Sequence, residues 1–294
     1  MSSEKFFTTK KALITLIAAS LVVIVSLGIR QTFGLFFFDF NADLNISISH
    51  FGFVIGLQLL MWGVFSPIFG FITDRYGGAT AIFIGFLFYL AGLFLFYSGL
   101  NTGYLFTLTI GLLIGIGLGG TAISIPVSVV AKHFPSSNRT IATGIVTCAG
   151  SFGFFVSPLL VRYSLIEIGW EITILYFCFL LGIGLITALF ISTPKTPVGN
   201  NDNNNQTAKE ALIEAFNNKS FIFLTLGFFV CGWHIALVAT HIPTYMMDRG
   251  MPDWTAAMIL ALVGVFNMIG TMGSGYLATK FSKKKVLSLS LIHI

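Results

Sequence analysis

The 294-residue chain is 55% hydrophobic and only 9% charged, whereas an ordinary soluble domain carries about a quarter charged residues. A water-soluble core cannot absorb this share of apolar side chains, so the composition excludes an ordinary soluble domain. The formal net charge of +5 does not indicate nucleic-acid binding, because the basic residues are scattered between apolar blocks and form no contiguous patch.

Apolar blocks of about 20 residues, the length of helix that crosses a bilayer, recur along almost the whole chain. Charged residues, Pro, Asn and Gly divide the sequence into eight predicted membrane helices and the start of a ninth, at residues 12–38, 50–73, 79–98, 104–131, 141–163, 170–192, 220–245, 254–279 and from 286 onward. The first block is long and lacks a small-residue cleavage site, so we interpret it as a retained helix rather than a signal peptide. The predicted fold is an all-α, polytopic membrane bundle.

A polar segment at residues 193–219 separates the sixth predicted helix from the seventh. It begins Pro-Lys-Thr-Pro after Thr193, continues through an Asn-rich tract and ends in a short amphipathic stretch. We therefore expect an N-terminal six-helix bundle at residues 1–192, a cytoplasmic linker at 193–219 and an incomplete C-terminal bundle at 220–294. With the N-terminus in the cytoplasm, thirteen of the sixteen Lys and Arg residues fall on the cytoplasmic side, as the positive-inside rule requires.

The sequence contains an internal repeat. Gly-Phe-Ile-Thr-Asp-Arg-Tyr-Gly closes the second helix at residues 70–77, and Gly-Tyr-Leu-Ala-Thr-Lys-Phe-Ser-Lys closes the eighth at residues 275–283, an offset of 205 residues. At nearly the same offset, residues 28–30 in the first helix match residues 232–234 in the seventh. Two half-molecules of six helices in the same membrane orientation produce this register, and such proteins bind their substrate at mid-depth between the halves.

Residues 70–77, read as Gly-x-x-x-Asp-Arg-x-Gly, resemble the loop signature of the major facilitator superfamily. The family pattern ends in two basic residues where this chain has Gly78 and Ala79, and the second copy has Thr279 in place of the acid. The resemblance implies a transporter of six plus six helices, so about three further helices would complete it. It also implies that four loop residues form a conformational gate, namely Gly70, Asp74, Arg75 and Gly77; the alternative is a helix end flanked by ordinary charges.

Three further segments resemble the monocarboxylate and oxalate/formate branch of that superfamily, at residues 30–34, 133–153 and 231–243. The likeness is to bacterial members, which implies a multi-pass protein of the bacterial inner membrane that carries small organic anions. Proton symport and anion exchange both stay open as mechanisms. The sequence has no Gly-Lys-Ser/Thr phosphate loop and no His-Glu-x-x-His pair, so we expect no enzyme activity, cofactor or metal.

Arg30 is the most informative candidate for substrate binding. A cation within a membrane helix costs about 2.5–3.5 kcal/mol and usually faces a cavity or a partner. Its guanidinium would grip a carboxylate with two hydrogen bonds. The alternative is that the helix ends near Ile29 and that Arg30 reaches outward to the surface, although the apolar residues 33–38 argue against it.

The remaining candidates are polar or aromatic residues in three other predicted helices. His234 is the repeat counterpart of Arg30, and His241 follows seven residues later on nearly the same helical face. Either histidine would donate a hydrogen bond to an anion or carry a coupled proton, although a lone helix histidine is more often a packing residue. Gln58 and Trp62 lie one turn apart, and Asn267 is the counterpart of Trp62; interhelical hydrogen bonds are the alternative role for the amides.

These residues favour a secondary transporter of small organic anions, in which two helical halves rock about a site that includes Arg30 and His234. Within the predicted helices no Asp or Glu lies deep, and the deep charge is positive. The alternatives are an exporter of neutral or cationic compounds and a membrane receptor that binds its ligand without transporting it.

Overall fold

The computed structural model describes residues 10–192, 208–282 and 284–288. Within these ranges the chain is almost entirely helical and contains no β-strand, which confirms the predicted all-α membrane bundle. Residues 193–207 of the expected linker and 289–294 of the expected ninth helix lie outside the described ranges. The elements are α1 (Lys10–Gln31), η2 (Phe33–Phe36), α2 (Phe37–Leu44), α3 (Ile48–Tyr76), α4 (Gly78–Tyr97), α5 (Gly103–Phe106), η3 (Thr107–Leu113), α6 (Ile114–Thr121), α7 (Ser124–His133), α8 (Ser136–Ala188), α9 (Ala208–Asn217), α10 (Lys219–Ala236), η4 (Leu237–His241), α11 (Ile242–Asp248) and α12 (Asp253–Lys280).

Seven helical stretches of the described chain are long and apolar enough to cross a membrane: Lys10–Leu44, Ile48–Tyr76, Gly78–Tyr97, Gly103–His133, Asn138–Ala188, Lys219–Asp248 and Trp254–Ser274. The fifth contains two of the predicted helices, because α8 is interrupted at Gly169, where φ is +78° and ψ is 171°. Glycine adopts positive φ at little cost because it has no Cβ. The seven stretches therefore account for the eight complete membrane helices expected from the sequence.

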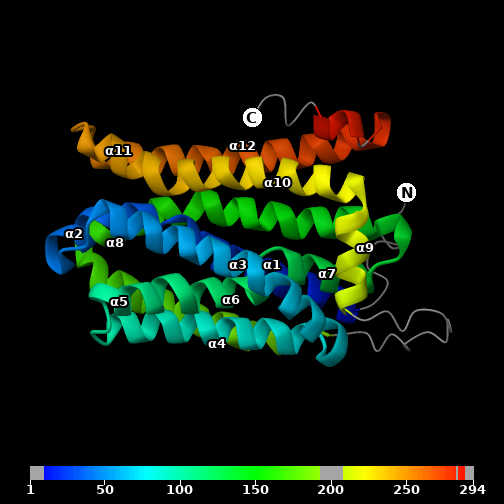
Figure 1. The fold of residues 1–294 in the computed structure, drawn as a ribbon, viewed down its shortest axis with the longest axis horizontal. Coiled ribbons are helices and arrows are strands. Elements are labelled where there is room, and N and C mark those ends of the chain that lie inside the picture. Colours follow the sequence, from blue (N-terminus) through cyan, green and yellow to red (C-terminus); the bar gives the residue numbers. More distant parts are fainter. Residues whose placement is uncertain (1–9, 193–207, 283, 289–294) are drawn as a thin grey trace.

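The long helices run nearly parallel to one another (Figure 1). α10 and α12 lie along one edge of the bundle and α4 along the opposite edge, while α8 contacts α1, α4 and α12. α9 lies at one end of the bundle, which we call the α9 end. α2 and α11 lie at the other, which we call the α11 end.

Aromatic side chains fill the core near α2. The ring of Phe40 packs 5.2 Å from that of Phe96 and 5.4 Å from that of Trp170, measured between centroids. The indole Nε1 of Trp170 donates a hydrogen bond of 2.7 Å to Oδ2 of Asp43. Rings at these separations attract one another beyond the simple burial of their surface. The cluster therefore fixes α2 against the second part of α8, and with it the end of the first membrane pass.

Candidate functional site

A cavity of about 480 Å³ lies where the helices before residue 192 meet those after residue 208. Its walls come from α1, α8, α10, η4 and α12, and its volume falls within the range of about 300–1,000 Å³ typical of small-molecule sites. Phe154 of α8 and Val238 of η4 are among the apolar residues that line it. The cavity thus lies between the N-terminal and C-terminal sets of helices.

Three polar side chains line this cavity, each from a different helix: Gln31, His234 and Asn267. The Nδ2 of Asn267 donates a hydrogen bond of 3.0 Å to Oγ of Ser151, which joins α12 to α8. His234 is exposed, whereas Gln31 is buried and its carbonyl Oε1 accepts no hydrogen bond. The structure therefore brings together His234 and Asn267, both predicted from the sequence, and adds Gln31, which the sequence reasoning missed.

Arg30 lies in the last turn of α1 and is only 4% exposed, so its side chain does not reach outward to the surface. It lies within electrostatic range of Tyr89 on α4, whose hydroxyl donates a hydrogen bond of 3.3 Å to the carbonyl oxygen of Ser26. The guanidinium atoms Nε and Nη2 are enclosed and have no hydrogen-bond partner. Arg30 is absent from the cavity wall, where the next residue, Gln31, takes its place.

Two close backbone approaches hold the N-terminal and C-terminal helices together. A Cβ on Gly34 would lie 2.5 Å from the carbonyl oxygen of Ala239, so η2 and η4 touch only because residue 34 has no side chain. A Cβ on Gly264 would collide with the backbone at Phe155, so α12 lies directly against α8. Small residues at such contacts let membrane helices approach closely.

The sequence profile of the Major Facilitator Superfamily matches residues 19–294. The chain belongs to this superfamily. It is similar to the agnestins efflux protein AgnL12 of Paecilomyces divaricatus, with 24% identity over 284 residues that cover 95% of this chain and 63% of the relative. It is 23% identical to the hexuronate transporter of Bacillus subtilis, over 82% of this chain and 58% of that protein. It is also 23% identical to the probable nitrate transporter NarT of Staphylococcus epidermidis, over 86% of this chain and 63% of that protein.

The chain therefore spans about three fifths of the length of these curated relatives. Among solved structures, the crystal structure of a D-xylose-proton symporter matches with a TM-score of 0.67 and 15% sequence identity. That match covers 92% of this chain and 69% of the symporter. It shows that the helices have the superfamily arrangement.

The loop that carries the superfamily signature lies at the end of α3. Oδ1 of Asp74 forms an ion pair with Nζ of Lys132 at 2.7 Å, which ties the end of α3 to the end of α7. The Arg75 guanidinium lies 5.6 Å from the ring centroid of Tyr76. Gly77 joins α3 to α4 with φ of +96°, a conformation that favours glycine. At Gly70 an added Cβ would meet nothing within 4 Å, so the described residues make no close helix contact there.

Gln58, Trp62 and His241 lie away from the cavity wall. Gln58 is fully buried, and its Nε2 donates a hydrogen bond of 3.0 Å to the carbonyl oxygen of Ile110, so it forms the interhelical hydrogen bond considered as the alternative. Trp62 is half-buried and packs against the hydrophobic core. His241 is exposed and its ring faces α3, because a Cβ on Gly52 would lie 3.4 Å from its Cε1.

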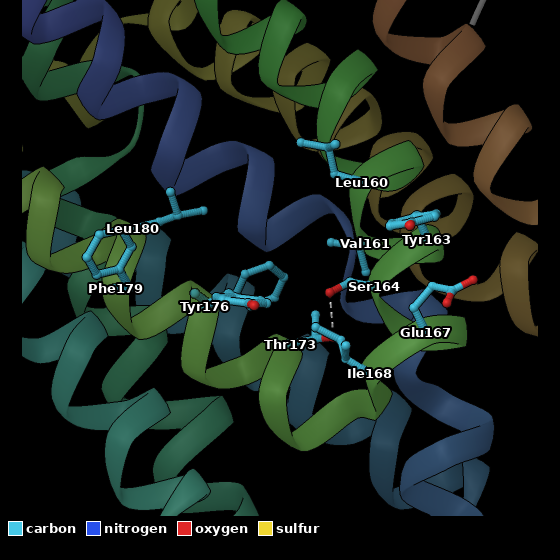
Figure 2. Close-up of a pocket in the computed structure, with 11 residues that line it drawn as sticks. Leu160, Val161, Tyr163, Ser164, Glu167, Ile168, Thr173, Tyr176, Phe179 and Leu180 are labelled. Atoms are coloured by element: carbon cyan, nitrogen blue, oxygen red, sulfur yellow. Dashed lines mark hydrogen bonds between the residues drawn. The ribbon is translucent and has the colours of Figure 1, made fainter.

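Two other cavities contain none of the candidate residues. One, of about 460 Å³, is formed by α8 alone on both sides of Gly169 (Figure 2). Within it the hydroxyl of Thr173 donates a hydrogen bond of 3.1 Å to Oγ of Ser164. The other, of about 700 Å³, is lined by residues of α1, α8 and α12. Neither is walled by α10 or η4, so the cavity that holds His234 is the better candidate for a substrate site.

Proposed function

We propose that this protein is a secondary transporter of small organic anions, monocarboxylates or dicarboxylates, which bind in the cavity lined by Gln31, His234 and Asn267. The observation that carries this proposal is the state of Arg30. Its guanidinium is buried, two of its nitrogens have no hydrogen-bond partner, and the residue that follows it lines the cavity.

An unpaired cation at membrane depth is costly, at about 2.5–3.5 kcal/mol on insertion scales. In the part of the chain that the structure describes, no carboxylate pairs with Arg30, and the carboxylate of Asp74 pairs instead with Lys132 at the end of α3. An uncompensated positive charge in a low-dielectric surrounding raises the potential of the neighbouring cavity and attracts anions into it. A cationic substrate would be repelled from the same place.

Two of the similar proteins support an anionic substrate. The hexuronate transporter of Bacillus subtilis and the probable nitrate transporter of Staphylococcus epidermidis are named for anions, although the anions differ in size and chemistry. The resemblance of residues 30–34 and 231–243 to the monocarboxylate and oxalate/formate branch favours a carboxylate. The similarity to an efflux protein keeps an exporter as the second candidate.

Transport by this protein would require the two sets of helices to separate at one end while they close at the other. The contacts of Gly34 with Ala239 and of Gly264 with Phe155 are the ones that must open and reform. We place the α9 end in the cytoplasm of a bacterial inner membrane, because Lys132 and most other basic residues lie on that side in the predicted topology. His234, exposed in the cavity, is the candidate carrier of a coupled proton.

Uptake into proteoliposomes tests the proposal. The protein should accumulate labelled monocarboxylate, and unlabelled anions should compete while cations and neutral sugars should not. Arg30→Gln should strongly reduce uptake at subsaturating anion and unchanged membrane abundance, whereas the matched change Arg249→Gln, at an exposed cation on the ring of Tyr245, should not. Uptake driven by an imposed pH gradient indicates proton symport, and uptake driven by internal anion indicates exchange. Binding without accumulation indicates a receptor, and uptake that tolerates Arg30→Gln contradicts the proposal.

A further inference from the structure

We infer that the cavity selects carboxylates that carry an apolar tail over polyhydroxylated or inorganic anions. This inference rests on the proposed anion transport and narrows its substrate class. Of the ten residues that line the cavity, seven are apolar, and they include Phe154, Val238 and Leu262. The remaining three lining residues, Gln31, His234 and Asn267, are polar.

The polar groups suffice for one charged head group. An amide from α1, an imidazole from α10 and an amide from α12 line the cavity, and each of these groups carries an N–H that donates hydrogen bonds to carboxylate oxygens. Asn267 already donates to Ser151, which leaves fewer donors for any second polar group on the cargo. The wall therefore offers little to a molecule with many hydroxyl groups.

The rest of the wall favours hydrocarbon. Burying a methylene group stabilises a complex by about 0.8 kcal/mol, which corresponds to roughly fourfold in affinity. A hydroxyl group set against Val238 or Leu262 instead loses its hydrogen bonds to water without replacement, which weakens binding. A nitrate ion is too small to cover the apolar wall of a cavity of about 480 Å³. The gain from burying methylene groups and the loss from desolvating hydroxyl groups therefore both favour carboxylates that carry an apolar tail.

A chain-length series tests this inference by calorimetric titration of the purified protein in detergent. Acetate, propionate, butyrate and hexanoate should bind with increasing affinity, by roughly fourfold per methylene until the cavity is filled. Galacturonate and nitrate should each bind more weakly than hexanoate by at least tenfold.

A pair of isosteric variants assigns the effect to the cavity. Val238→Thr replaces one methyl of the wall by a hydroxyl and should weaken hexanoate binding by about threefold to fivefold, a larger loss than for acetate, whose single methyl covers less of the wall. Val230→Thr makes the same change on the exposed surface of α10, outside the cavity, and should change neither. Equal affinity for acetate and hexanoate, or tighter binding of galacturonate, would overturn the inference but leave anion transport standing. Failure to bind any of these anions would overturn the proposed function as well.

Discussion

Replacing Arg30 by Met is expected to stabilise the protein while it weakens anion binding. The methionine side chain has a similar length and carries no charge, so it fills the space beside Tyr89 without leaving a buried guanidinium unpaired. Because such a charge costs about 2.5–3.5 kcal/mol in a membrane helix, its removal should raise the midpoint of thermal unfolding by at least about 2 °C.

The effect of Arg30→Met on binding follows from the distance between the guanidinium and the cavity. For an anion held at Gln31, the adjacent residue of α1, we take a separation of about 8 Å from the charge, at which an effective dielectric constant near 20 gives about 2 kcal/mol of attraction. Loss of that attraction should weaken anion binding about 30-fold. Stability and function therefore change in opposite directions at this one position.

Differential scanning fluorimetry and calorimetric titration with butyrate measure the two effects on the same sample. Arg249→Met removes an exposed cation outside the cavity and serves as the control, with both quantities expected to stay near those of the parent. A variant Arg30→Met that unfolds at a lower temperature would mean that the guanidinium stabilises the fold. One that binds butyrate as tightly as the parent would refute the electrostatic reasoning.

Three further predictions concern the contacts around the cavity. Gly34→Ala places a Cβ against the Ala239 carbonyl and should hold the two sets of helices apart at η2 and η4. The separation is measured as a longer distance between spin labels on the two sets of helices. Gly56→Ala adds a Cβ with nothing within 4 Å and should leave that distance unchanged. A double-mutant cycle of Ser151→Ala and Asn267→Ala should give a coupling free energy of about 0.6 kcal/mol in unfolding, and zero coupling would deny that this hydrogen bond joins α8 to α12. Asp74→Asn should cost less than about 1 kcal/mol of stability, and the loss should vanish in concentrated salt because the ion pair is exposed.

The fold could be predicted because membrane helices are marked by length and composition alone. Each complete predicted span coincides over most of its length with a helical stretch that is apolar enough to cross a bilayer, although the spans 79–98, 170–192 and 254–279 run past the ends of those stretches. The superfamily match agrees with the loop at residues 70–77. The interruption at Gly169 was also visible, since it separates the predicted helices at 141–163 and 170–192. These features depend on local sequence, which a single chain displays.

The orientation of individual side chains could not be predicted in the same way. The repeat aligned Arg30 with His234, yet consecutive residues of an α-helix point about 100° apart, so a shift of one position moves a side chain from the cavity to the core. Gln31 lines the cavity and Arg30 does not. The 3₁₀ segment Phe33–Phe36 and the π segment Leu237–His241 alter the helical register at the same depth, and no pattern in the sequence predicted them.

The apolar wall of the cavity was also hidden from sequence reasoning. Phe154, Val238 and Leu262 look like the many other apolar residues of a membrane helix, and only the packing of α8, η4 and α12 distinguishes them. Polar residues such as Asn267 stood out because an amide is rare in such a setting. Part of the polar lining was therefore predictable from the sequence, but the apolar surface that sets the shape of the site was not.

Anion binding between the two sets of helices is tested most directly by an experimental structure of the protein with 4-bromobenzoate, a carboxylate whose bromine gives an anomalous X-ray signal. We expect bromine density inside the cavity near Val238, with the carboxylate toward Gln31 and His234. Bromine bound only elsewhere, for example in the cavity formed by α8 in Figure 2, with the site between the two sets of helices empty, would contradict it.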